Sequence, residues 1–400
     1  MIFYPVEGGD KAEFLDKADG TLSLFRWPGT AAERAEIPAS VNGIPVTEVE
    51  SLAFAPFHMT GQEYERNFRP PYSFNMFALM NAAKLLREEK DEGGPEEIIL
   101  PESVSIIGAY AFWHCSRLKS IKIPEKVLRI REGCFGECVS LERITLPAAL
   151  RFIGLCKTAD GGDSAEITPE MLRGMPDVGA FYSCHALKEI VLPETVILLG
   201  PQTFNSSGLT RLSLREGTKD ILVAENAFDH AAALQWMDHI REDGSVKSRI
   251  GLPAARDKIL TADRKFGRLS HLPRDFFTKD IGWFDVLARD IFRLDFAARM
   301  AVARLRYDEG LSGNDREWYI GVLTDYFAQA PQFMPTAKDD EAYSELFSVL
   351  EETGSLTAER VSNLIRTAGR EHLSSALMTR MLKVRTESFS GATGFEDLEI

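Results

Sequence analysis

A period of 23 residues is the feature that most constrains this chain. Apolar-proline steps fall at Pro101, Pro124 and Pro147, each 23 residues apart, and another falls at Pro193, 46 residues further on. Further columns of apolar residues keep the same register. They are Phe112, Phe135, Phe181, Phe204 and Phe228; Cys115, Cys138 and Cys184; and Leu118, Leu141 and Leu187. A unit this short cannot bury its own apolar side, so neighbouring units are expected to stack and share one core.

The clearest copy of the repeat runs from Leu100 to Pro124. The unit in general reads Val-x-x-Ile-Gly and then Ala-Phe-x-x-Cys-x-x-Leu-x-x-Ile-x-Leu-Pro, and this copy has Ile123 in place of the last leucine. The alternating Leu-x-x-Ile-x-Leu piece predicts a strand with one buried face. Proline ends this strand because it cannot donate to a ladder, and glycine permits a turn where a side chain would clash. Phenylalanine is expected to fill the interior.

These columns resemble the BspA-like class of bacterial leucine-rich repeats over residues 35–230. An early copy lies at Ile37-Pro38, at Val41–Val49 with Asn42-Gly43 as its turn, and at Ala53-Phe54. Members of that class are mostly binding or adhesion proteins. The resemblance therefore implies recognition rather than chemistry.

Two insertions, residues 57–95 and 156–178, interrupt the array. Phe74–Lys90 in the first has the pattern of an amphipathic helix. The second contains Asp160-Gly161-Gly162-Asp163, a flexible-loop signal. This run lacks the ligand spacing of a calcium loop, so a surface turn is favoured over a metal site.

After Leu252-Pro253 the pattern becomes helical. Helices are predicted over Asp285–Tyr307, Arg316–Ala328 (capped by Ser312), Asp339–Glu352 (ended by Gly354), Ala358–Ala368 (capped by Thr357) and Glu371–Thr386. Short connections predict antiparallel pairs. We therefore expect an α+β chain with an N-terminal cap over residues 1–34, a leucine-rich-repeat solenoid over 35–250 and an all-α domain over 251–400.

Two stretches of the helical part resemble a tail found behind leucine-rich repeats in uncharacterised proteins of gut Firmicutes. They are Ala303–Tyr307 with Gly310-Leu311-Ser312, and Ile365–Leu382. This resemblance implies no function. Because an exposed sheet edge invites aggregation, the tail is expected to cap the open end of the solenoid.

Charge excludes several classes of function. The formal net charge is −14, which argues against nucleic-acid binding and against an anionic membrane surface. No stretch is long and apolar enough to predict a membrane span, and no secretory signal is visible. Five cysteines without a Cys-x-x-Cys pair are typical of a reducing compartment, so a cytoplasmic location is expected. A surface location would follow if a signal had been trimmed from the chain.

Candidate chemistry is sparse. His114-Cys115 and Cys184-His185 bring a thiol and an imidazole together in sequence, but adjacent residues on an extended segment point opposite ways. Each cysteine also occupies a repeat column, which favours a buried filler. Cys134 does not lie at a sequence spacing from the other cysteines and histidines that is typical of zinc ligands. No nucleotide-binding or hydrolase motif occurs, so we predict neither catalysis, metal nor cofactor.

A binding surface is expected where the polar positions of the strands face outward on the concave side of the solenoid. The candidate residues are Ser120, Lys122, Arg143, Thr145, Glu189, Arg211 and Ser213, with Trp113 as a contact residue at the turn. Lys122, Arg143 and Arg211 form a basic stripe that suits an acidic peptide. The alternative is that these are ordinary exposed strand residues.

The function predicted from the sequence is a non-enzymatic scaffold that binds a protein or peptide partner. Two alternatives remain: a cell-surface adhesin and a cysteine-dependent enzyme. The sequence leaves the oligomeric state open.

Overall fold

The structure of the chain, a computed structural model, contains two compact units. It describes residues 1–6, 11–28, 33–55, 93–154, 178–218, 221–224, 227–228, 230–231, 233–252, 281–290, 294–308, 310–333, 340–370 and 373–389. In this part of the chain the first unit ends at Gly244 and the second begins at Ser245. None of the described helices is long and apolar enough to cross a bilayer. The predicted Phe74–Lys90 helix and the Asp160–Asp163 loop lie outside the described residues.

The first unit begins with antiparallel strands. β1 (Ile2–Pro5) pairs with β2 (Lys11–Asp16), and β2 pairs with β3 (Leu22–Arg26). β5 (Ser40–Val41) forms a hairpin with β6 (Ile44–Val49) through Asn42 and Gly43, whose φ angles are 53° and 80°. Two residues of positive φ are typical of a type I′ turn, so the predicted Asn-Gly turn is confirmed. β6 also pairs in parallel with β3, which joins the cap to the repeats.

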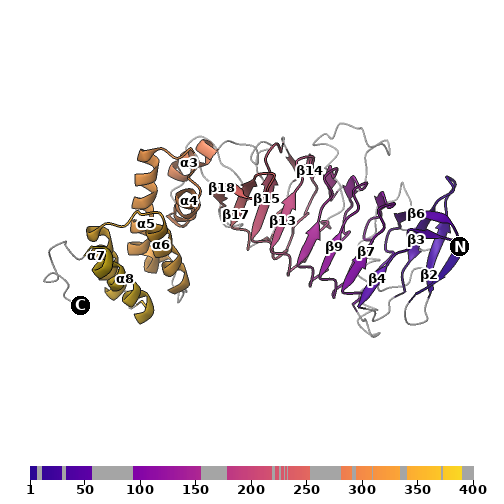
Figure 1. The fold of residues 1–400 in the computed structure, drawn as a ribbon, viewed down its shortest axis with the longest axis horizontal. Helices are drawn as coiled ribbons and strands as arrows, with labels where there is room; N and C mark the ends of the chain where they lie inside the picture. The colour runs from indigo at the N-terminus through magenta and orange to yellow at the C-terminus, as the bar shows by residue number, and fades with distance from the viewer. Residues whose placement is uncertain are drawn as a thin grey trace. The chain divides into compact units, whose positions relative to one another are not determined.

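Each repeat contributes one strand to a row of parallel strands (Figure 1), which form two hydrogen-bonded sheets. The strands are β4 (Arg34–Glu36), β7 (Glu97–Ile99), β9 (Ser120–Lys122), β11 (Arg143–Thr145), β13 (Glu189–Leu192), β15 (Arg211–Arg215) and β17 (Trp236–Ile240). They pair in the orders β11-β9-β7-β4 and β13-β15-β17. The middle residues Ile98, Ile121 and Ile190 are at most 4% exposed, as the alternating pattern predicts.

A second ladder of short strands closes the other side of each turn. Its members are β8 (Ile106–Ile107), β10 (Arg129–Ile130), β12 (Phe152–Ile153), β14 (Leu198–Leu199) and β16 (Leu222–Val223). β10, β12, β14 and β16 pair in that order, and β8 pairs with β6. The chain therefore forms a β-solenoid.

A continuous stack of phenylalanine rings runs through the core between the two ladders. Centroids of successive rings lie 5.2 Å apart for Phe54–Phe112, 5.1 Å for Phe112–Phe135, 5.5 Å for Phe135–Phe181, 5.5 Å for Phe181–Phe204 and 5.4 Å for Phe204–Phe228. All six rings are at most 5% exposed. The predicted solenoid is confirmed, because residues one period apart in sequence lie on top of one another.

The insertions leave the stack unbroken. Phe135 and Phe181 are 46 residues apart in sequence, yet their rings stack directly at an interplanar angle of 5°. In the second ladder Phe152 is the register partner of Leu198. The turns before and after the second insertion are therefore direct neighbours, although that insertion is one period long.

The corner after each phenylalanine uses a left-handed backbone at residues that are not glycine. His114, Glu137, Ser183, Ser206 and His230 have φ between 55° and 60°. The backbone N–H of His114 donates to Gly136 O at 2.8 Å, and that of Glu137 donates to Tyr182 O at 2.8 Å. Positive φ costs free energy in residues with a Cβ. The hydrogen bonds between turns offset this cost, and no glycine signal marks these corners in the sequence.

The cysteine column forms a second ladder inside the core. The Sγ atoms of Cys138 and Cys184 donate to the carbonyls of Phe112 and Phe135 in the preceding turns, both at 3.1 Å. Cys115 makes the same contact with Phe54 O at 3.7 Å. Burial raises the pKa of Cys138 and Cys184 far above the ordinary range of a thiol, because a thiolate is poorly solvated there. These cysteines act as small core residues.

The second unit contains one strand and six described helices. They are β18 (Val246–Gly251), α3 (Ile281–Asp290), α4 (Leu294–Arg306), α5 (Gly313–Phe333), α6 (Asp340–Glu352), α7 (Ala358–Arg370) and α8 (Ser375–Ser388). α4 packs on α5, and α7 packs on α8. Since short loops join the members of each pair, the helices run antiparallel, as predicted.

One predicted helix was wrong. The stretch Asp285–Tyr307 belongs to two helices, α3 and α4, rather than one. Both bury apolar residues of the same periodicity, including Phe284 and Phe296, and α3 packs against α4. Periodicity shows which face is buried and not whether the backbone is continuous.

The predicted caps at Ser312 and Thr357 and the end of α6 before Gly354 are confirmed, whereas α5 extends beyond the predicted Arg316–Ala328 at both ends and α8 begins at Ser375 instead of Glu371. The Ser312 hydroxyl accepts a hydrogen bond from the Asp315 backbone N–H at 3.1 Å, and Thr357 accepts one from Arg360 N–H at 3.1 Å. Gly354, with φ of 62°, ends α6. Hydroxyl caps of this kind satisfy N–H groups that have no partner within the helix.

A buried ion pair connects α3 to α4 and α5. The side chain of Arg304 is fully buried, and its guanidinium donates to Asp285 Oδ1 at 2.9 Å and Oδ2 at 3.2 Å. The Tyr319 hydroxyl donates to the same carboxylate at 2.7 Å. Burial and the charge of Asp285 raise the pKa of Tyr319, so the phenol keeps its proton.

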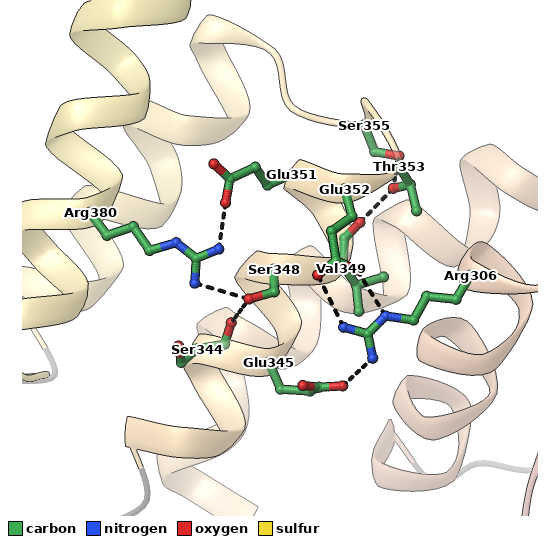
Figure 2. A network of polar contacts seen from close by, with 10 residues as sticks. All are labelled: Arg306, Ser344, Glu345, Ser348, Val349, Glu351, Glu352, Thr353, Ser355 and Arg380. Carbon is green, nitrogen blue, oxygen red and sulfur yellow. Dashed lines mark hydrogen bonds and ion pairs between the residues drawn. The ribbon is translucent and has the colours of Figure 1, made fainter.

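A polar network joins α6 to the helices on both sides of it (Figure 2). Arg306 of α4 donates to Glu345 and, at 3.0 Å, to Glu352. Arg380 of α8 donates to Glu351 at 2.5 Å and to Ser348 at 2.9 Å. Both arginines therefore fix the position of α6.

Replacing Phe135 by alanine should remove one ring from the middle of the stack. We expect the free energy of unfolding to fall by about 3–5 kcal/mol, since a cavity is left between two rings. Urea unfolding followed by circular dichroism measures this change. Val139→Ala, an exposed position in the same turn, should cost about 0.5 kcal/mol or less. Equal losses in the two variants would contradict the stack as the main support of the solenoid.

Arg304→Met should destabilise the helical unit by about 3–5 kcal/mol, because it leaves Asp285 buried without a counter-charge. The triple variant Asp285→Leu, Arg304→Met and Tyr319→Phe removes all three polar groups together. It should recover most of the loss in thermal unfolding. The control is Arg360→Met, which breaks an exposed ion pair with Glu317 and should cost under about 1 kcal/mol. A triple variant no more stable than Arg304→Met would contradict this account.

Cys115, Cys134, Cys138 and Cys184 should resist a thiol reagent in the native protein, even at about pH 9, since their thiols are buried. Labelling is read by mass spectrometry of peptides. The exposed variant Lys126→Cys provides a reactive reference, and denaturant should expose all four cysteines. Rapid labelling of Cys115 or Cys184 in the native protein would instead support the alternative of a cysteine-dependent enzyme.

Candidate functional site

The outward positions of the strands in this row are here called the strand face. It consists of the first and third residues of β7, β9, β11, β13, β15 and β17: Glu97, Ile99, Ser120, Lys122, Arg143, Thr145, Glu189, Val191, Arg211, Ser213, Trp236 and Asp238. The phenylalanine stack lies behind it, so these side chains project from a rigid support. All the strand residues predicted to bind lie on this surface.

Four of the predicted residues meet on two adjacent strands. In the register of β9 and β11, Arg143 lies beside Ser120 and Thr145 lies beside Lys122. Neighbouring strands are about 4.8 Å apart, and alternate residues point the same way. The group of four, called the basic square, therefore presents two cations on one diagonal and two hydroxyls on the other.

The two cations of the basic square differ in their surroundings. Lys122 donates from Nζ to Glu102 Oε1 at 2.7 Å, and this hydrogen bond raises the pKa of Lys122. The same contact and the backbone N–H of Glu125 lower the pKa of Glu102. Arg143 is exposed and has no ion pair within the described part of the chain. Arg143 is thus the cation on this surface best able to meet an anion.

Arg211 belongs to the same face but is already balanced by carboxylates. Its Nη1 lies 3.3 Å from Glu189 Oε2, and its Nε lies 3.6 Å from Asp238 Oδ2. The side chain of Asp238 is only 2% exposed, so Arg211 serves as its counter-charge. Ser213 is 2% exposed and is not accessible to a partner. The predicted three-residue stripe is therefore reduced to Lys122 and Arg143.

Trp236 also lies on the strand face and is not among the residues predicted from the sequence. It is half-buried and is the register partner of Arg211. The repeat that contains β17 lacks the apolar-proline step that marks several other copies, so this strand was not predicted. The alternation Trp-Met-Asp-His-Ile was the available signal.

The expectation that Trp113 is an exposed contact residue was wrong. Its side chain is 4% exposed and stacks on Tyr182 with centroids 6.4 Å apart. A Cβ placed on Gly136 of the next turn would lie 2.0 Å from the indole ring. The indole ring of Trp113 thus fills the space above Gly136. The position of Trp113 beside a turn in the sequence does not reveal this contact.

The Cys-His neighbours do not form a catalytic pair. His114 Nδ1 lies 2.8 Å from Glu137 in the next turn, whereas Cys115 points to a carbonyl of the preceding turn. Cys184 is buried and His185 is exposed. Within the described residues no group of three or more His, Cys, Asp or Glu side chains is arranged to bind a metal ion.

Comparison with known families finds one match. Residues 94–156 and 177–240 match the family described as BspA type Leucine rich repeat region, in six copies. The matched ranges leave out most of the second insertion. No curated protein matches the chain.

Several solved structures are similar to this chain. A leucine-rich-repeat protein of T. pallidum is 23% identical, with 58% of this chain and 80% of that one covered and a TM-score of 0.40. A leucine-rich cell surface protein of Faecalibacterium prausnitzii is 17% identical, with 62% and 58% covered and a TM-score of 0.34. A leucine-rich-repeat protein of Bacteroides capillosus is 25% identical, with 38% and 86% covered and a TM-score of 0.26.

The matched residues are the same ones that repeat in sequence and stack in space. Over residues 94–156 and 177–240 the solenoid of this chain matches the BspA-type leucine-rich-repeat region.

Proposed function

We propose that this chain is a non-catalytic interaction protein that binds a protein partner through the strand face. The observation that carries the proposal is the row of polar and charged side chains on a sheet backed by a continuous aromatic stack. A surface that is already rigid loses little conformational entropy when it binds. The BspA-type repeats support a role in recognition.

The charge of the strand face favours an acidic segment as the partner. The chain carries a net charge of −14, yet β9 and β11 present Lys122 and Arg143 without an acidic residue on either strand. A local cation on an acidic protein selects against basic partners and orients acidic ones. Arginine also binds carboxylates through two parallel hydrogen bonds.

Peptide selection tests this function. We expect peptides selected from a random displayed library against the whole protein to be enriched in Asp and Glu. The double variant Lys122→Glu and Arg143→Glu should weaken their binding at least about tenfold, because it reverses both charges of the basic square. Binding should also weaken as salt is raised.

The matched control is Lys126→Glu, which reverses an exposed charge in the turn after β9 and should leave binding unchanged. Arg211 is kept in all variants, because its guanidinium pairs with the buried side chain of Asp238. Equal binding by the wild type and the double variant would refute the strand face as the binding surface.

A further inference from the structure

The basic square carries more hydrogen-bond donors than a carboxylate can accept. Arg143 has a guanidinium with five N–H groups, Lys122 has three, and the hydroxyls of Ser120 and Thr145 add one each. A carboxylate offers two oxygens, whereas a phosphoryl group offers three and close to two negative charges. The donors lie side by side on two strands in register, so they can contact several oxygens of one ligand.

Both hydroxyls are available to a ligand. Neither Ser120 nor Thr145 makes a side-chain hydrogen bond within the described residues, and Thr145 is exposed while Ser120 is half-buried. Hydroxyls beside cations are donors to phosphate oxygens rather than competitors for them, because they carry no negative charge.

The two cations of the basic square favour a ligand with more than one negative charge. Glu102 already holds Lys122 in an ion pair whose side chains are 58% and 61% exposed. Exposed pairs of this kind contribute little, so the lysine can exchange Glu102 for a stronger acceptor. Glu189 of β13 is itself paired with Arg211, whose Nη1 lies 3.3 Å from Glu189 Oε2. Attraction to Arg143 and Lys122 grows with the charge of the ligand, so a dianion gains more from the two cations than a monoanion does.

We propose that the basic square binds a phosphorylated side chain of the protein partner. This inference rests on the proposed function and names the chemical group that the strand face recognises. Arg143 supplies the guanidinium contact to two phosphoryl oxygens, Lys122 supplies the second charge, and the two hydroxyls complete the set of donors.

The experiment is a titration of the full chain with O-phosphoserine at constant ionic strength, followed by amide chemical shifts. N-acetylaspartate serves as the carboxylate probe, and inorganic phosphate tests whether the phosphoryl group alone suffices. We expect saturable shifts confined to residues 120–122 and 143–145, with both phosphoryl probes binding at least about fivefold more tightly than N-acetylaspartate.

Variants locate the site. Arg143→Ser should weaken O-phosphoserine binding at least about tenfold, and Thr145→Val should weaken it about threefold while keeping the shape of the side chain. Lys126→Ser should bind as the wild type does. All three positions are exposed, and unchanged circular dichroism confirms that each variant folds.

Two results would overturn the inference. If N-acetylaspartate binds as tightly as O-phosphoserine, the basic square recognises carboxylates, and the proposed function stands without the phosphoryl group. If Lys126→Ser weakens binding as much as Arg143→Ser, the shifts report general charge attraction and not a site. Failure of the proposed function itself is seen separately, as peptide binding that the strand face does not influence.

Discussion

Contact between successive turns is the interaction on which the solenoid depends. Each phenylalanine ring stacks on the next at 5.1–5.5 Å, and backbone N–H groups at the corners donate to carbonyls of the adjacent turn. A single turn has too little apolar surface to fold alone, so its neighbours supply the missing partners. The same contacts tolerate left-handed backbone at residues such as Glu137, since a hydrogen bond in the next layer offsets the strain.

In this solenoid, the residues that stabilise the fold are different from those that are available to bind a partner. The second residues of β7, β9, β11, β13, β15 and β17 are apolar, whereas the outward positions differ from turn to turn. Ion pairs such as Lys122–Glu102 and Lys119–Glu96 connect neighbouring turns at the surface. Outward residues can therefore change the ligand of the strand face without changing the fold.

The helical unit is held together by different means. Its core includes a buried pair, Asp285 and Arg304, and its surface includes the arginines of Figure 2 that contact α6. Buried pairs fix geometry more than they add stability, because desolvation offsets much of the attraction. The solenoid is stabilised by contacts that recur from turn to turn, whereas the helical unit is stabilised by individual contacts of this kind.

The amino-acid sequence determined the period, the strand positions, the phenylalanine stack and most helix ends, because each follows from local patterning that recurs or from capping chemistry within a few residues. It did not determine that Trp113 is buried, that α3 and α4 are separate helices, or that Arg211 is neutralised by Asp238. These facts depend on residues brought together from other turns or helices. Only the tertiary structure decides which side chains share a space, and so only it reduces the basic stripe to Lys122 and Arg143.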